Sequence, residues 1–92
     1  MAKQIVLLTI KLGERHKPTG KTQHFVHGSL MEKPETLQIV RYENDMGYYL
    51  LYLNHEGNEM TDTYHDSLES ALEQAYWEFG VESYEWNKIG SQ

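Results

Sequence analysis

The chain has 92 residues, of which 39% are hydrophobic and 12% aromatic, with no cysteine and a formal net charge of −6. This length fits one domain with a modest core, and the apolar content is enough for folding without a disulfide or a metal ion. The lack of cysteine excludes thiol chemistry and fits a reducing compartment, the cytoplasm. No apolar run approaches the roughly 20 residues that a membrane-spanning helix needs. We therefore expect a single soluble domain over residues 1–92.

The charges are divided unevenly along the chain. Residues 1–42 hold seven of the eight Lys and Arg residues and three Glu, a net charge of +4, whereas residues 43–92 hold only Lys88 against eleven Asp and Glu, a net charge of −10. The acidic half repels phosphates, which disfavours nucleic-acid binding, and it attracts a basic protein partner. An acidic surface also serves solubility alone, so a partner is one of two interpretations.

The first third of the chain predicts one long strand and a loop. Residues 4–12 are rich in Ile, Val, Leu and Thr, which is typical of a strand. Residues 13–22 contain two Gly and one Pro among polar neighbours and predict an exposed loop. Residues 23–26 are a short strand candidate, and residues 30–35 are expected to be irregular because Pro34 resists regular pairing.

Three further strands form a predicted meander. Residues 36–43 and 47–54 flank Asn-Asp-Met-Gly at 44–47, residue types that tolerate tight turns. Another turn follows, and residues 59–64 return as a strand.

A helix is predicted directly after the meander. Asp66 or Ser67 can cap its start, and Gly80 suits a left-handed C-terminal cap. Residues 81–89 are too apolar for a free tail, so a short turn or helical piece docked on the domain is expected. The elements together predict an α+β fold, a mostly antiparallel meander sheet of four to five strands with one C-terminal amphipathic helix packed on one face. One apolar stripe of the helix comprises Leu68, Ala71, Leu72, Ala75 and Phe79.

The alternation of the hairpin strands separates two faces, because side chains two apart share a face. We expect the more apolar face to meet the helix. The other face, with an aliphatic and tyrosine surface and one Arg, then either binds a partner or is covered by residues 23–35. The candidate partner-binding residues there are Arg41, Tyr48 and Tyr52. The face expected to meet the helix holds Val40, Tyr42, Tyr49, Leu51 and Leu53, and the other holds Leu37, Ile39, Arg41, Tyr48, Leu50 and Tyr52.

Trp77 is a further partner-binding candidate. It lies nine positions after Leu68 and therefore points almost directly away from the apolar stripe. Either Tyr84 or Trp86 folds back over the indole, or Trp77 is an anchor for a partner, since Trp is enriched at interface hot spots.

The loop at 13–22 ends in Gly-Lys-Thr, which invites comparison with a phosphate-binding P-loop. The spacing is wrong, because Arg15 stands where that motif needs its first Gly, and the residues that follow do not predict a helix. A basic loop that attracts anions is the better interpretation, and its candidate binding residues are Arg15, Lys17 and Lys21.

No catalytic or metal site is predicted. His24 and His27 point to opposite faces of an extended strand and cannot chelate one ion there, so the five histidines are expected to be surface or edge residues. The chain has no nucleophile elbow and no paired-carboxylate pattern. We accordingly predict no cofactor, and an enzyme is only a less favoured alternative.

Residues 61–81, TDTYHDSLESALEQAYWEFGV, hold a strand, a capped helix and a Gly stop. This segment resembles the C-terminal region of small bacterial α+β proteins of uncharacterised function, some of which look like immunity proteins, and it brings no catalytic residue with it. The leading hypothesis is a non-enzymatic protein-interaction module, of inhibitor or immunity type, that binds a basic partner and is a monomer or weak dimer. The alternatives are a small ligand-binding or anion-binding domain that uses the loop at 13–22, and a minor enzyme.

Overall fold

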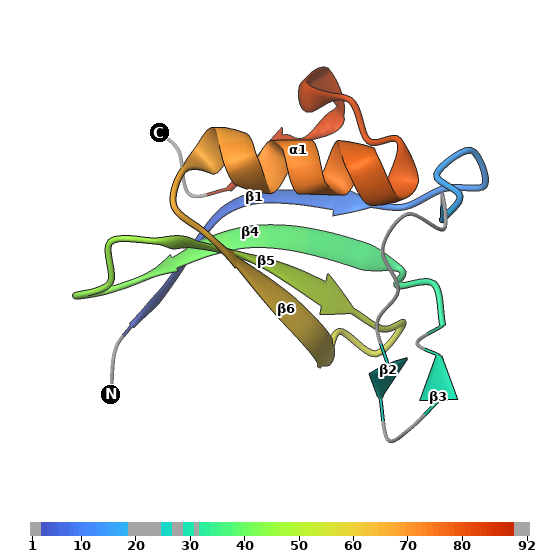
Figure 1. Ribbon diagram of the computed structural model, residues 1–92, viewed down its shortest axis with the longest axis horizontal. Helices are drawn as coiled ribbons and strands as arrows, with labels where there is room; N and C mark the ends of the chain where they lie inside the picture. The colour runs from blue at the N-terminus through green and yellow to red at the C-terminus, as the bar shows by residue number, and fades with distance from the viewer. Residues whose placement is uncertain (1–2, 19–24, 27–28, 31, 90–92) are drawn as a thin grey trace.

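The structure, a computed structural model, describes residues 3–18, 25–26, 29–30 and 32–89. Five strands form one antiparallel sheet in the order β6-β5-β4-β1-β7, and one helix lies along one of its faces (Figure 1). The predicted α+β class, with a β4-β5-β6 meander, is confirmed. The elements are β1 (Gln4–Lys11), β2 (Phe25–Val26), β3 (Ser29–Leu30), β4 (Thr36–Tyr42), β5 (Tyr48–Leu53), β6 (Glu59–His65), α1 (Leu68–Phe79), a 3-10 turn (Ser83–Glu85) and β7 (Asn87–Lys88).

Two short strands, β2 and β3, pair with each other as a separate hairpin. The strand candidate at 23–26 is therefore found over its last two residues, and residues 23–24 lie outside the described part of the chain. Leu30, which we expected in an irregular segment, belongs to β3, whereas residues 32–35 have no regular structure.

β1 changes faces along its length. Its register with β4 shifts between Val6 and Leu8, and such a bulge inserts an extra residue into the alternation. As a result Val6 shares a face with its partner Val40, while Leu8 shares the opposite face with its partner Ile39.

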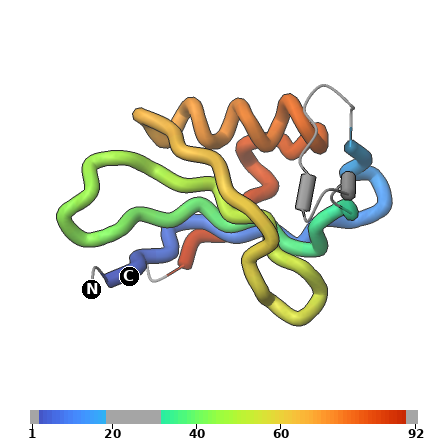
Figure 2. The backbone as a smooth tube through the Cα atoms, turned by 60° about the horizontal axis from the view of Figure 1, so that its bottom comes forward, coloured from blue at the N-terminus to red at the C-terminus, as the bar shows by residue number. Residues whose placement is uncertain are grey.

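The C-terminal residues extend the sheet rather than only docking on it. Asn87 and Lys88 pair with the middle of β1, and the backbone N–H of Ile89 donates to the carbonyl of Leu7 at 3.1 Å. Figure 2 shows this last segment running beside β1. Trp86, just before β7, is buried in the main core, so the prediction of a docked segment at 81–89 is confirmed and includes a fifth strand.

The helix has the predicted ends. Ser67 is the N-cap, and its hydroxyl accepts a hydrogen bond from the backbone N–H of Ser70 at 3.1 Å. Gly80 has φ 71°, and its N–H donates to the carbonyl of Tyr76 at 2.9 Å. Within the described residues, no helix is long and apolar enough to cross a membrane.

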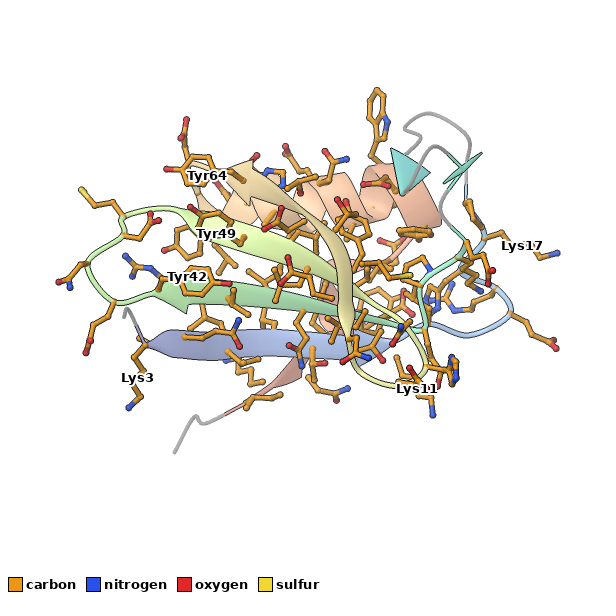
Figure 3. All side chains as sticks on the ribbon, turned by 90° about the horizontal axis from the view of Figure 1, so that it is seen from below. Lys3, Lys11, Lys17, Tyr42, Tyr49 and Tyr64 are labelled. Atoms are coloured by element: carbon orange, nitrogen blue, oxygen red, sulfur yellow. The ribbon has the colours of Figure 1, made fainter. Side chains whose placement is uncertain are left out.

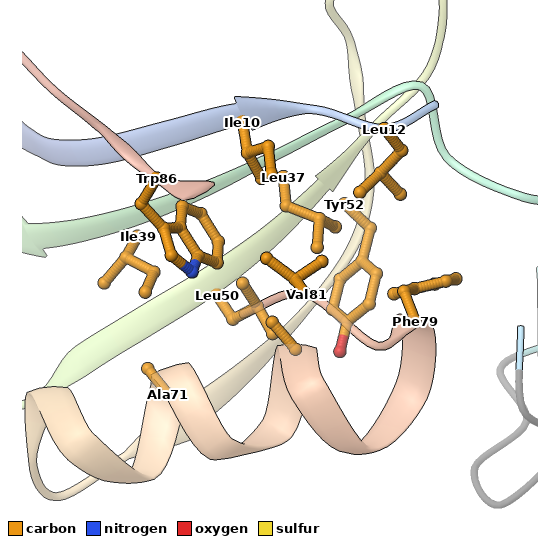
Figure 4. Packing of buried hydrophobic residues seen from close by; sticks show 11 residues of the cluster. Ile10, Leu12, Leu37, Ile39, Leu50, Tyr52, Ala71, Phe79, Val81 and Trp86 are labelled. Atoms are coloured by element: carbon orange, nitrogen blue, oxygen red, sulfur yellow. The ribbon is translucent and has the colours of Figure 1, made fainter. Parts of the chain in front are cut away.

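The main core lies between α1 and one face of the sheet (Figure 4). Ala71, Ala75 and Phe79 of the predicted stripe are buried there, and Leu68 and Leu72 pack at its margin. The sheet contributes mainly aliphatic side chains and one tyrosine. Its buried members are Ile10, Leu12, Leu37, Ile39, Leu50 and Tyr52, joined by Val81 and Trp86 from the C-terminal segment.

The helix packs on the opposite face of the β4-β5 hairpin from the one we predicted. The predicted grouping is right, because Leu37 pairs with Tyr52 and Ile39 with Leu50. The prediction of which group lies under the helix was wrong. On β4, the face under the helix carries Leu37 and Ile39, with Arg41 near the end of the strand, whereas Thr36 and Gln38 share the other face with Val40. The helix therefore covers the aliphatic pair Leu37 and Ile39, which are 0% exposed, as the hydrophobic effect favours.

Candidate functional site

Three tyrosines form a row across the sheet face opposite α1, which we call the open face because the described residues place no helix on it. Tyr42, Tyr49 and Tyr64 come from the adjacent strands β4, β5 and β6 and lie side by side in Figure 3. The ring centroids of Tyr42 and Tyr49 are 5.2 Å apart at 75°, and those of Tyr49 and Tyr64 are 5.1 Å apart at 69°. Both pairs thus have the edge-to-face geometry that aromatic rings prefer. We call this set the tyrosine row.

A small second core lies beneath the tyrosine row. Val40, Leu51 and Leu53 are buried, although no described helix covers this face, and Tyr42 and Tyr49 are among the side chains that pack against them. The rings therefore shield the aliphatic residues and keep their own outer surfaces accessible. Tyr64 remains 53% exposed.

The β4-β5 turn fixes the middle ring of the row through Asp45. Its carboxylate accepts a hydrogen bond from the Gly47 N–H at 2.8 Å and another from the Tyr49 hydroxyl at 2.8 Å. These bonds, the Gly47 one foremost, hold the pKa of Asp45 below its usual range, so the group stays ionised. The same hydrogen bond to Asp45 raises the pKa of Tyr49. A negative charge is thus fixed beside the middle ring.

Gly47 makes room for the outer ring of the row. A methyl group at this position would overlap the Cε1, Cζ and hydroxyl atoms of Tyr64. The ring therefore lies directly on the turn backbone, which only glycine permits. At the β1 side of the row, the side-chain amide of Gln4 donates to the Tyr42 hydroxyl at 3.2 Å.

Two further carboxyl groups lie on the same face of β6, N-terminal to Tyr64. Asp62 pairs with Leu51 and Glu59 with Leu53, so both belong to the open face, and both are exposed. Partial desolvation, together with the neighbouring Asp62 carboxylate, raises the pKa of Glu59. Among the described residues, no Lys or Arg forms an ion pair with either group. This corner of the open face therefore carries uncompensated negative charge.

The partner-binding candidates of the other hairpin face lie on the helix side. Tyr52 is 0% exposed, and its hydroxyl donates to the Glu78 carboxylate, so it cannot contact a partner and that prediction is corrected. Tyr48 packs partly against the main core, and the Arg41 guanidinium lies 5.0 Å from its ring centroid. The physical reason is the reversed face assignment, which puts this tyrosine surface under α1.

Trp77 lies on the outer side of α1, as its spacing predicted, and is 51% exposed. Trp86, one of the two residues expected to fold over it, is instead a member of the main core, and Tyr84 is 80% exposed. Whether Trp77 anchors a partner stays a prediction.

A polar cluster lies between α1 and the β5-β6 strands. Besides Tyr52, the side-chain amide of Gln74 donates to Glu78 at 2.7 Å, and the buried carboxylate is thereby satisfied. Desolvation first, and the Glu78 hydrogen bond second, raise the pKa of Tyr52 far above its usual value, so the hydroxyl stays protonated as a donor. Glu78 follows Ala71 by seven positions and so shares its direction on the helix, a spacing that predicts partial burial.

His65 belongs to the same region. Its Nδ1 lies 2.8 Å from the Ser70 hydroxyl and its Nε2 lies 2.7 Å from the Thr63 hydroxyl. Burial lowers the pKa of His65. The second ring nitrogen faces a hydroxyl and not a carboxylate, so the Ser70 and His65 pair lacks the group that orients the base in a catalytic triad.

The basic loop is tied to the 3-10 turn. Arg15 forms an ion pair with Glu85, and the Nε2 of His16 lies 2.7 Å from the same carboxylate oxygen. The Gly13 N–H donates to the Nδ1 of His16 at 2.9 Å, so the Nε2 carries the proton and donates to Glu85. A backbone hydrogen bond from Glu82, followed by the bond from His16 and that from Arg15, lowers the pKa of Glu85 to about 2.

This arrangement weakens the anion-binding interpretation of the loop. The charge of Arg15 is already paired, while Lys17 is exposed and Lys21 lies outside the described residues. The expectation of surface histidines is wrong for His16, which is only 5% exposed; His65 lies on an edge strand as expected but is also buried. Within the described part of the chain, no three His, Asp or Glu residues are grouped so that they could hold a metal ion.

The tyrosine row was not among the predicted sites, although the sequence carries a signal for it. Tyr42 and Tyr49 were grouped on one face, and Tyr64 extends that face to the next strand when the β5-β6 register is known. The fold and this surface define a small α+β protein with an aromatic, acidic sheet face. Comparisons with protein-family models, curated proteins and solved structures found no match to this chain.

Proposed function

We propose that this chain is a non-enzymatic protein-interaction module that binds a basic protein partner through its open face. The observation that carries the proposal is the tyrosine row, three edge-to-face rings on a sheet face without a described helix. Tyrosines offer large rigid contact area and a polar hydroxyl, and they are enriched at protein interfaces. The buried Val40, Leu51 and Leu53 beneath them supply a rigid base.

The charges around the row support a basic partner. Asp45 is hydrogen-bonded to the middle ring, and the charge of Arg41 acts on it. Asp62 and Glu59 belong to the same face on β6, and no Lys or Arg of the described residues forms an ion pair with either of them. Complementary charge steers association and suppresses wrong partners, whereas phosphate groups would be repelled. The lack of cysteine in the chain is consistent with a reducing cytoplasm as the place where the module works.

The test compares two tyrosines of the open face with a third that lies outside it. The immobilised wild-type chain is incubated with nuclease-treated lysate of the organism that encodes it, and the retained protein is identified, purified and titrated against variants. Tyr64→Ala and Tyr42→Ala should weaken binding by about thirtyfold, the effect of truncating an interface hot spot. The matched control is Tyr84→Ala, which removes an 80% exposed ring outside the open face, and binding should stay within about twofold.

Two results would contradict the proposal. If Tyr64→Ala and Tyr42→Ala bind as tightly as the wild type while their melting temperatures are unchanged, the open face is not the binding surface. If nuclease treatment removes the retained material, the partner is a nucleic acid and the electrostatic argument fails.

A further inference from the structure

β6 forms one edge of the main sheet, and no strand among the described residues pairs with its outer side. The strand has seven residues and contains neither Pro nor Lys. Proteins usually protect such an edge with these residues, with a short strand or with a cover, because its unpaired N–H and C=O groups are a template for another strand. The β5-β6 register shifts between Tyr52 and Leu53, so residues 61–65 are the regular part of this edge.

The side chains at this edge have one charge sign. Tyr64 and Asp62 occupy alternate positions of β6 and share the open face, since they pair with Tyr49 and Leu51. Glu59 extends the acidic side of this surface toward the start of the strand. The helix that follows adds two exposed carboxyl groups, Glu69 and Glu73, and no Lys or Arg.

We propose that β6 accepts an extended segment of the partner as an additional antiparallel or parallel strand, with Arg or Lys side chains of that segment on the open face against Tyr64 and Asp62. This inference rests on the proposed function and specifies its mode. A paired strand lies about 4.8 Å away and brings directly opposite Cβ atoms to about 4.5–5.5 Å. An Arg opposite Asp62 or Tyr64 then reaches the carboxylate or the ring face.

Charge also decides between a basic partner and a second copy of this chain. In the antiparallel register that pairs all seven residues of two β6 strands, Asp62 faces Asp62 of the other copy. Like charges directly opposite each other destabilise a strand pair, and each chain carries a net charge of −6. A basic segment paired with β6 would place opposite charges, not like charges, beside Asp62. We therefore assign the edge to a heterologous partner.

The test uses a synthetic nine-residue peptide of alternating Thr and Arg, acetylated and amidated at its ends. It is titrated into the full-length ¹⁵N-labelled chain at low salt while backbone amide resonances and amide hydrogen exchange are recorded. The shifts should be largest at residues 61–65, and amides of this segment should gain protection. The control peptides replace every Arg with Glu, or carry N-methyl groups on all backbone amides.

The expected order of peptide affinities separates the contribution of charge from that of strand pairing. The Glu peptide should bind at least tenfold more weakly, and the N-methylated Arg peptide should bind without protecting β6 amides or should not bind. The double substitution Asp62→Asn with Glu59→Gln should weaken the Arg peptide by about three- to tenfold, the range for two surface ion pairs, with an unchanged or higher melting temperature.

Three outcomes would overturn the inference. The first is that the largest chemical-shift changes fall outside β6 and its neighbour β5. The second is that the Arg and Glu peptides bind equally well, and the third is that the N-methylated peptide protects the β6 amides from exchange as fully as the Arg peptide does. Concentration-dependent dimerisation that protects β6 without any peptide would assign the edge to a second copy instead. The proposed function is judged separately by Tyr64→Ala and Tyr84→Ala, so partner binding that depends on Tyr64 can survive a failed peptide titration.

Discussion

Gly47→Ala offers a direct test of the tyrosine row. The added methyl group would overlap the ring of Tyr64, while the backbone of Gly47 does not have the positive φ that would make alanine strained in itself. The ring is the mobile end of a half-exposed side chain, so we expect it to swing off the turn rather than the hairpin to break. The protein should fold and lose the outer member of the row.

The cost follows from what the displaced ring gives up. The edge-to-face contact of Tyr64 with Tyr49 contributes about 0.5–1.5 kcal/mol, and overpacking typically costs about 1–3 kcal/mol. Replacing Gly with Ala also stabilises the folded state by about 0.4–1 kcal/mol, because alanine restricts the conformations of the unfolded chain. Together these terms predict that Gly47→Ala lowers the free energy of unfolding by about 0.5–4 kcal/mol, measured by urea denaturation, and a displaced ring places the value in the lower half of that range.

A double-mutant cycle identifies the cause. In a Tyr64→Ala background the clash is gone, so adding Gly47→Ala should change stability by less than about 0.5 kcal/mol or raise it slightly. The control is Gly57→Ala, which meets no atoms but has φ 84° and should cost the same in both backgrounds. If Gly47→Ala costs as much without the tyrosine ring as with it, the ring does not lie on the turn and the geometry of the row is refuted.

Two further predictions concern the polar contacts. Tyr52→Phe should lower the free energy of unfolding by about 1–3 kcal/mol, because the buried Glu78 carboxylate loses a donor; a change below about 0.5 kcal/mol in thermal melts would mean that its other donors suffice. Glu85 has a folded pKa of about 2 against 4.5 for the free group, so its contribution to stability is complete above about pH 4.5 and is lost as the pH falls toward 2. Glu85→Gln should flatten the decline in urea midpoint between pH 5 and 2, and an unchanged slope would contradict this role.

The sequence predicts the elements well because their signals are local. The Ser67 and Gly80 caps, the apolar stripe and the turn at 44–47 each depend on residues within a few positions of one another. The face of the sheet that receives the helix is not a local property. It depends on how polar and apolar side chains are distributed over all the strands of the sheet. Thr36 and Gln38 make the face with Tyr42, Tyr49, Leu51 and Leu53 more polar than the hairpin alone suggested.

Two other features, the bulge in β1 and the cluster around Glu85, could not be predicted from the sequence for a geometric reason. The bulge between Val6 and Leu8 exchanges the faces of β1 without any Gly or Pro to mark it. The cluster of Arg15, His16 and Glu85 joins positions about 70 residues apart, so no spacing rule could predict it. Such contacts form only when the C-terminal segment pairs with β1 and brings the 3-10 turn to the loop.

The strand order places the basic half and the acidic half of the sequence toward different sides of the sheet. β1, from the basic half of the chain, lies toward one side of the sheet, with Lys3 and Lys11 at its two ends in Figure 3, and β6, from the acidic half, forms the opposite edge. If the partner is basic, as we propose, it is attracted toward β6, which orients it before contact. Since Tyr64 belongs to β6, the same edge carries both the electrostatic attraction and the most exposed ring of the tyrosine row. Association should thus slow with added salt mainly through Asp62 and Glu59, while dissociation depends on Tyr64.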